Sequence, residues 1–373
     1  MKYLILLNFI IIFFNSSAGG ETIETKLLSA QQDLYNAKYQ LAQQKFLAIA
    51  KEYPLHPAGH FFQAMTNLWQ LGFAPDNTGL IKNSLVLLKI AQNLAERALK
   101  ANKQESEMFF WRGMSSGVIA ICETLLESAP EQRNPSLFIS SIIGQLKIFR
   151  LFQSTINDLQ QSLKKNPEFT DAQLGLALFD LYLGGGNQKK GVKQLWSVID
   201  KGKYMKVEAS YLLMDFLFGQ GTDEDLLYRA IPTSLGLSMQ FPNNLLFSLT
   251  LAKLYYEVGN VDEAKAILTE ILNGNNKPYQ NYIIDEARYF LGTIAFNQEN
   301  YLLGIEHYNP ILASKPKLPS YVLPWTYFRS AQCYWKLGNI DRARAMLNHT
   351  LKTENVNNVH NEANQLLKIL SKN

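Results

Sequence analysis

One spacing between small residues recurs three times between Leu245 and Leu351, and it limits the folds open to this chain. In each copy a second small residue follows the first after twelve positions, and a larger apolar or aromatic residue comes four positions later. The three sets are Ala252, Ala264 and Leu268; Gly292, Gly304 and Tyr308; and Ala331, Ala343 and Leu347. Their first members lie 40 (292 − 252) and 39 (331 − 292) positions apart. We interpret each copy as a hairpin of two helices whose backbones approach closely at the small residues.

The pattern resembles the tetratricopeptide repeat, whose signature has small residues in both helices, a Gly-Asn type of turn between them and often a proline after the second helix. A fourth copy begins at Ala30, with Ala42 twelve positions later, then Phe46, and Pro54 as the closing proline. The standard repeat has about 34 residues, so the longer spacings predict lengthened loops between repeats. Residues 174–260 also loosely resemble solenoids related to the inclusion-body-clearance family of tetratricopeptide proteins.

This resemblance implies an all-α chain, a right-handed α-α superhelix or solenoid of about eight helical hairpins with a C-terminal capping helix. Each repeat of a solenoid is expected to pack only on its neighbours, so 373 residues can still form one unit. The predicted organisation is a signal peptide at 1–18 and one solenoid at 19–373, with a first repeat-like unit at 25–57, an irregular region at 58–165, divergent repeats at 166–242, three regular repeats at 243–354 and a capping helix at 358–372. Within the irregular region, long helices are expected at 80–100, 105–127 and 136–165.

The first residues have the pattern of a secretory signal peptide. Lys2 precedes an apolar run at 3–14 that only Asn8 interrupts, and small residues lead up to a cleavage site after Ala18. The alternative is an uncleaved membrane anchor, but twelve residues rise only about 18 Å as a helix, short of the ~30 Å hydrocarbon core. We therefore expect an exported protein, periplasmic or secreted, with association to the cell envelope left open and no membrane span after cleavage.

The net charge argues against a nucleic-acid partner. It is +4 for the whole chain and +3 once Lys2 is removed with the signal peptide (4 − 1), and this is close to neutral for such a length. A nucleic-acid-binding surface normally needs a clear excess of basic residues. The two cysteines, Cys122 and Cys333, are expected to be buried free thiols, because a solenoid keeps distant repeats apart.

No motif supports catalysis, a metal or a cofactor, so the chain is expected to be non-enzymatic. His56 and His60 have the spacing of a metal pair on a helix, but Pro57 and Gly59 lie between them, which favours a surface turn. The glycine run at 184–186 precedes two lysines, Lys189 and Lys190, an arrangement that resembles a phosphate-binding loop. It follows an expected helix rather than a strand and lacks the Gly-Lys-Ser/Thr sequence, so it is interpreted as a helix end.

Two functions from different classes remain. The first is a non-enzymatic exported scaffold or adaptor that binds a protein or peptide in the concave groove of the solenoid. The second is a small-ligand or glycan binding protein, or an enzyme, that uses an aromatic pocket, since the chain has 21 Phe, 18 Tyr and 5 Trp. The scaffold is favoured, because aromatic residues at helical spacing usually form the core.

The resemblance also implies which residues line the groove. In tetratricopeptide repeats these lie three and six positions before the first small residue, and one, four and five positions after it. The rule selects Trp325, Phe328, Gln332, Trp335 and Lys336 in the last repeat; Glu286, Tyr289, Thr293, Phe296 and Asn297 in the one before; and Leu246, Leu249, Lys253, Tyr256 and Glu257 in the earliest. This aromatic face lacks a lysine and arginine cluster for a terminal carboxylate, so an internal or helical segment is the expected ligand. The alternative for each ring is packing on the adjacent helix.

Overall fold

The computed structural model describes residues 21–71, 77–128, 138–183, 187–218, 224–274, 281–316 and 320–371. All regular secondary structure in these ranges is helical, which confirms the all-α fold. The α-helices are α1 (Ile23–Tyr35), α2 (Tyr39–Glu52), α3 (Ala58–Leu71), α4 (Thr78–Ala101), α5 (Ser106–Ser128), α6 (Phe138–Lys165), α7 (Gln173–Leu178), α8 (Gln188–Lys201), α9 (Lys206–Leu217), α10 (Glu224–Gln240), α11 (Leu245–Glu257), α12 (Val261–Asn273), α13 (Asn281–Asn297), α14 (Tyr301–Ser314), α15 (Val322–Lys336), α16 (Ile340–Thr350) and α17 (Val359–Leu370). A 3-10 turn, η4 (Thr170–Ala172), precedes α7, a π-helix, η5 (Phe179–Leu183), follows it, and a second 3-10 turn, η7 (Val356–Asn358), precedes α17.

In the part of the chain that the structure describes, consecutive helices pair into eight hairpins, from α1 with α2 to α15 with α16, and α17 packs on the last two as the predicted cap. Odd-numbered helices also contact one another along most of the chain, as α9 does with α11, α11 with α13 and α13 with α15. The even-numbered helices of these hairpins pack mainly on the odd-numbered ones. The odd-numbered helices therefore form the inner layer of the superhelix, where a groove is expected.

The turn inside each recognisable repeat has a left-handed residue at the same position. Ala37, Gly259, Glu299 and Gly338 each lie seven positions after the first small residue of their repeat, with φ of 58°, 81°, 60° and 77°. An asparagine follows the last three, and the side chains of Asn300 and Asn339 accept hydrogen bonds from backbone N–H groups in the first turns of α14 and α16. Only glycine adopts this backbone conformation without strain, so two of the four turns carry an unfavourable residue.

The small residues lie where the sequence pattern predicts them. Ala252, Ala264, Ala331 and Ala343 are fully buried. Both cysteines are buried free thiols, as expected, and burial raises the pKa of Cys122 to about 11 and that of Cys333 to about 12.

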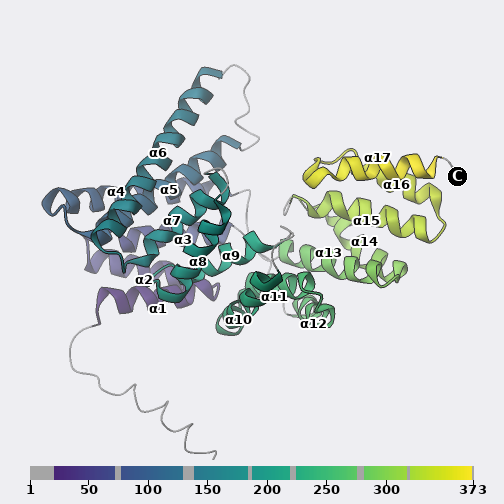
Figure 1. The fold of residues 1–373 in the computed structure, drawn as a ribbon, viewed down its shortest axis with the longest axis horizontal. Helices are drawn as coiled ribbons and strands as arrows, with labels where there is room; N and C mark the ends of the chain where they lie inside the picture. The colour runs from purple at the N-terminus through teal and green to yellow at the C-terminus, as the bar shows by residue number, and fades with distance from the viewer. Residues whose placement is uncertain are drawn as a thin grey trace, which may run out of the picture.

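The first helix does not remain at one end of an open stack. Gln31 of α1 donates to the carbonyl of Tyr204 at 2.7 Å, and the Tyr35 hydroxyl donates to the Glu208 carboxyl group at 2.6 Å. The side chain of Asn244 donates to the carbonyl of Tyr35 at 3.0 Å. The first five hairpins thus close into one turn, and helices α1 to α9 form the block on the left of Figure 1. The expectation that each repeat packs only on its neighbours is wrong for the first repeat.

Large aromatic rings fill the inside of this closed block, which is the physical reason for its closure. Trp111 lies 5.3 Å, between ring centroids, from both Phe61 and Tyr204, and Trp69 lies 5.7 Å from Tyr35. Burying these rings against one another removes a large apolar area from water. The inner face of the first half is therefore core, and an accessible inner face is left to the stack from α11 to α17, on the right of Figure 1.

The end of the stack is covered as predicted. Val359, Ala363 and Leu370 of α17 are fully buried against α15 and α16, and the indole of Trp325 donates to the carbonyl of Val356 at 3.2 Å. In the described ranges, none of the helices combines the length and hydropathy needed to cross a bilayer. The predicted signal peptide at 1–18 lies outside the described residues.

Candidate functional site

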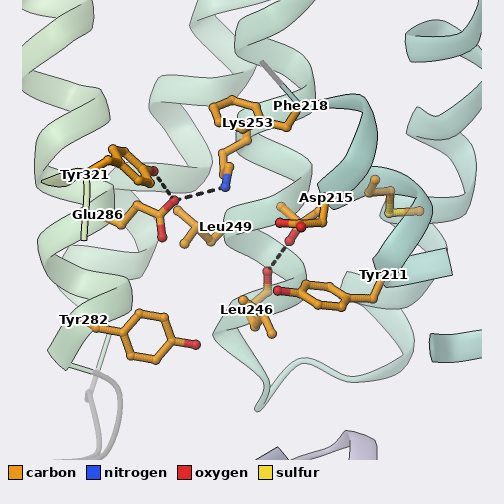
Figure 2. A pocket seen from close by; sticks show the side chains of 11 residues that line it. Tyr211, Asp215, Phe218, Leu246, Leu249, Lys253, Tyr282, Glu286 and Tyr321 are labelled. Atoms are coloured by element: carbon orange, nitrogen blue, oxygen red, sulfur yellow. Dashed lines mark hydrogen bonds and ion pairs between the residues drawn. The ribbon is translucent and has the colours of Figure 1, made fainter. Parts of the chain in front are cut away.

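A pocket of about 240 Å³ opens on the inner layer where the closed block meets the regular repeats. Its walls come from α9, α11 and α13, and from Tyr321, which precedes α15 (Figure 2). Its lining residues are Tyr211, Met214, Asp215, Phe218, Leu246, Leu249, Thr250, Lys253, Tyr282, Glu286 and Tyr321. The pocket therefore lies between a divergent repeat and the regular repeats, and its lining combines charged and aromatic side chains.

One wall of the pocket holds a satisfied ion pair. The ammonium of Lys253 lies 3.0 Å from Glu286 and 4.1 Å from the centroid of the Phe218 ring. The side chains of Lys253 and Glu286 are 14% and 5% exposed. The Tyr321 hydroxyl donates a short hydrogen bond to the same Glu286 oxygen, as Figure 2 shows. The Lys253 charge is thus compensated on both sides, and Glu286 already has two partners.

The opposite wall holds a carboxyl group without such compensation. Asp215 projects from α9 at the pocket mouth, where the residue is exposed to solvent, and no hydrogen bond or ion pair joins it to another described residue. Partial desolvation by the surrounding pocket raises the pKa of Asp215; the Lys253 ammonium opposes this rise, and the Glu286 carboxylate adds to it. Counting formal charges, Asp215 and Glu286 against Lys253 leave the pocket with one excess negative charge.

Aromatic and aliphatic side chains form the rest of the lining. Figure 2 shows Tyr211 and Tyr282 reaching toward the middle of the pocket from α9 and α13. Burial raises the pKa of both hydroxyls, so both remain protonated. Leu246 and Leu249 lie between the charged walls and provide apolar surface.

The structure divides the predicted groove residues into three groups. Leu246, Leu249, Lys253 and Glu286 line the pocket. A second group packs within the helix stack: Tyr289, Thr293 and Phe328 are 8%, 4% and 4% exposed. For these residues the structure agrees with the alternative, packing on an adjacent helix. The others, which keep part of their surface accessible, are Tyr256, Glu257, Phe296, Asn297, Trp325, Gln332, Trp335 and Lys336.

The accessible residues of the third group lie beyond the pocket, on α11, α13 and α15. Asn297 donates to the Tyr256 hydroxyl at 3.1 Å, which joins the inner helices of two repeats. The guanidinium of Arg329 lies 5.4 Å from the Phe296 ring centroid and 5.9 Å from that of Trp325. These residues, here named the aromatic row, continue the inner face from α11 to α15 as an aromatic surface with polar groups at its border.

The offset rule selected four of the eleven residues that line the pocket and missed the other seven (11 − 4). Tyr211, Asp215 and Phe218 belong to or follow α9, whose repeat diverges from the regular pattern. Tyr282 and Tyr321 each lie ten positions before the first small residue of their repeat (292 − 282 and 331 − 321). This shared offset is a signal that sequence reasoning could have used.

His56 lies in the turn between α2 and α3, as the sequence predicted, but its side chain is only 21% exposed. Its ring lies 6.1 Å from that of Trp111, and its Nε2 is 3.9 Å from the Glu107 carboxylate. Burial lowers the pKa of both His56 and His60. The glycine run at 184–186 lies outside the described residues.

A second cavity, of about 520 Å³, lies in the closed block between α5, α6, α7 and η5. Apolar side chains such as Met114, Phe152 and Phe179 line it, and none of its described lining residues is charged. The adjoining π-helix η5 contributes Phe179 and Tyr182 to its wall. Such π turns occur frequently at functional sites.

Comparisons with known proteins bear on the repeats. Two family models, both described as tetratricopeptide repeat, match residues 249–319 and 326–355. The fold is similar to the human IFIT1 dimer with m7Gppp-AAAA, with a TM-score of 0.45 and 11% identity over 94% of this chain and 82% of that chain. For the Cut9-Hcn1 hetero-tetramer of APC/C the TM-score is 0.41, with 13% identity over 91% and 89% of the two chains. For the TPR domain of P58(IPK) it is 0.28, with 16% identity over 94% and 99%. The sequence comparison with curated proteins gave no match.

Proposed function

We propose that this chain, a member of the tetratricopeptide-repeat superfamily, is a non-enzymatic scaffold that binds a segment of a protein along the inner face from α9 to α15. The observation that carries the proposal is the pocket at the start of this face, with its uncompensated Asp215. Apolar surface with a few polar groups that lack partners is typical of a recognition site. The aromatic row that extends the face supplies contact area for the rest of an extended or helical segment.

The sign of the pocket charge favours a protein segment over a nucleic acid. Asp215 and Glu286 outnumber Lys253, and phosphate groups, such as those of the m7Gppp-AAAA in the IFIT1 structure, would be repelled there. A peptide can instead offer backbone N–H groups and basic side chains to these carboxylates.

The test is a random peptide library displayed on phage and selected on the full chain. We expect enriched peptides whose capture is lost in Asp215→Trp, because the indole would fill the pocket from its mouth without entering the core. The matched control is Glu306→Trp on the exposed side of α14, which should capture peptides as the wild type does. Melting temperatures would show whether either variant is damaged. Failure to enrich any peptide, or undiminished capture by Asp215→Trp, would contradict the proposal.

The second cavity favours a second candidate function, the binding of a small apolar molecule. Its volume of about 520 Å³ is within the usual range of ligand pockets, and its lining offers a ligand almost no polar partner. A thermal-shift screen with fatty acids and steroids on the full chain would test it. A rise in melting temperature that Gly117→Phe abolishes would support this function, because Gly117 lines the cavity. No rise with any compound would contradict it.

We also propose that the protein works outside the cytoplasm. The apolar run at 3–14 and the small residues before Ala18 support export by a secretory signal. Cell fractionation and sequencing of the mature N-terminus test this. A protein that stays in the cytoplasm with Met1 and the apolar run attached would contradict it.

A further inference from the structure

We propose that the pocket recognises a basic side chain, lysine or arginine, that the bound segment inserts between α9 and α13. This inference rests on the proposed function, since it names the group of the protein segment that enters the pocket. It is argued from charge, from the aromatic rings, and from the shape of the space.

The charge argument begins with the imbalance between the two walls. Lys253 is held by Glu286 at 3.0 Å and by the ring of Phe218, so its positive charge is not available to Asp215 as a close partner. Asp215 faces the same hollow and has no partner among the described residues. A cation entering the pocket would compensate this carboxylate and relieve its repulsion with Glu286.

The rings supply a second attraction for a cation. Tyr211, Tyr282 and Tyr321 line the pocket together with Phe218. The face of an aromatic ring attracts an ammonium or guanidinium group, and the attraction grows as water is excluded. Lys253 over Phe218 at 4.1 Å shows that the pocket already accommodates a cation of its own in this way.

The shape of the space suits a flexible aliphatic chain that ends in a charge. The volume of about 240 Å³ exceeds the ~150 Å³ of an engineered cavity that binds benzene, so a lysine or arginine side chain can enter. Leu246, Leu249 and Met214 provide apolar surface for its methylene groups. Long basic side chains bury their stems in this way while the charged end finds polar partners.

The experiment uses peptides enriched from the phage library on the full chain. We expect a lysine or arginine at one position of the enriched sequences. Replacing that residue with norleucine, or with citrulline for arginine, should weaken binding about tenfold or more, the loss expected for a charged hydrogen bond. Asp215→Asn should weaken the charged peptide by a similar factor and leave the neutral analogue unchanged, while Glu306→Gln should change neither.

The outcomes separate this inference from the proposed function. Enriched peptides without a basic residue, whose capture is nonetheless lost in Asp215→Trp, would overturn the inference and leave the scaffold standing. The inference would also be overturned if replacing the basic residue by its neutral analogue weakened binding equally in the wild type and in Asp215→Asn. The basic group would then bind at a site other than Asp215. If no peptide is enriched, yet n-butylammonium alone shifts the melting temperature and Asp215→Asn abolishes the shift, the pocket takes a free amine. That result would overturn both the inference and the scaffold.

Discussion

The ring of Tyr308 on α14 fills the space that a β-carbon on Gly292 of α13 would occupy. Such a carbon would lie 2.8 Å from Cδ1 of the ring and closer still to Cε1. The other two regular repeats place Leu268 and Leu347 where this one has Tyr308, and they have alanine where this one has Gly292. The larger filler and the smaller partner thus compensate each other across the hairpin.

This relationship predicts a reversal of sign in a double mutant. Gly292→Ala should destabilise the wild type by about 1–3 kcal/mol, because Tyr308 is fully buried and cannot move aside. In a Tyr308→Leu background the same change should be neutral or stabilise by up to ~1 kcal/mol, since alanine favours helix over glycine. Chemical denaturation monitored by circular dichroism measures the stability of the wild type, of the two single mutants and of the double mutant. An equal cost of Gly292→Ala in both backgrounds would mean that the two residues are not coupled.

The left-handed turn residues predict a stabilising substitution. Glu299 adopts φ of 60° where two other repeats have Gly259 and Gly338. Glu299→Gly should therefore raise the stability by up to about 1 kcal/mol, because it removes the strain of a side chain in this conformation. Gly338→Ala, the converse change in the next repeat, should lower it by a similar amount. Melting temperatures of the two variants check the prediction, and a fall for Glu299→Gly would contradict it.

The buried Glu208 predicts a dependence of stability on pH. Burial raises its pKa to about 7 from 4.5, although the hydrogen bond from Tyr35 opposes the rise. Between these two values the folded chain keeps a proton that the unfolded chain has lost, so stability falls as the pH rises through this window. The fall is on the order of 3 kcal/mol, since one pKa unit corresponds to about 1.4 kcal/mol. Below the window this loss is absent, and above it the loss is complete.

Glu208→Gln isolates this contribution, because glutamine can accept the same hydrogen bond but does not titrate. We expect the stability of the variant relative to the wild type to increase between pH 4.5 and 7. The other carboxyl groups titrate alike in both chains and cancel in the difference. Parallel stability curves for the two chains would show that Glu208 titrates normally in the fold.

The ion pair at the pocket wall predicts non-additive losses. Lys253→Met would leave Glu286 buried with only Tyr321 as a partner, at a cost of about 3–5 kcal/mol. Glu286→Gln should remove much of that cost when combined with Lys253→Met, because no uncompensated charge remains. A double-mutant cycle by chemical denaturation measures the coupling. Strictly additive losses would mean that the pair contributes nothing as a pair.

The aromatic row predicts which rings serve binding rather than packing. Phe296 and Trp335 are only partly buried, so Phe296→Ala and Trp335→Ala should each cost less than the ~3–5 kcal/mol of a fully buried aromatic residue. Capture of library-derived peptides should fall in both variants, and further when they are combined. Phe328→Ala is the matched control: because Phe328 is only 4% exposed, this variant should lose more stability than Phe296→Ala or Trp335→Ala. Full loss of stability with unchanged capture would assign Phe296 and Trp335 to the core.

Local structure could be predicted from the sequence because local patterns encode it. The long helices expected at 80–100, 105–127 and 136–165 are α4, α5 and α6, with ends that agree within two residues. Apolar spacing, prolines and turn residues lie within the segment that they shape. The spacing of small residues succeeded for the same reason, since Gly292 and Gly304 approach each other within one hairpin, where a β-carbon on Gly304 would lie 3.4 Å from the Gly292 carbonyl oxygen.

The closed block could not be predicted, because its contacts join residues that share no local pattern. Gln31 is 173 positions from Tyr204, and Asn244 is 209 positions from Tyr35. Curvature accumulated over five hairpins brings these residues together. Asp215 was missed for a related reason. Its helix, α9, reaches the groove because it packs on α11, where the closed block meets the regular repeats, and no local sequence pattern encodes that contact.

The closure of the first five hairpins also bears on how a chain of this kind can change its number of repeats. A duplicated hairpin within the block would displace α9 from α1 and separate Tyr35 from Glu208, so the number of units there is determined by the return of the chain to its start. From α11 onward no such return is needed, and a unit added or lost before α17 would leave each remaining hairpin with equivalent neighbours. Variation in repeat number among proteins with this architecture should therefore be confined to the C-terminal half.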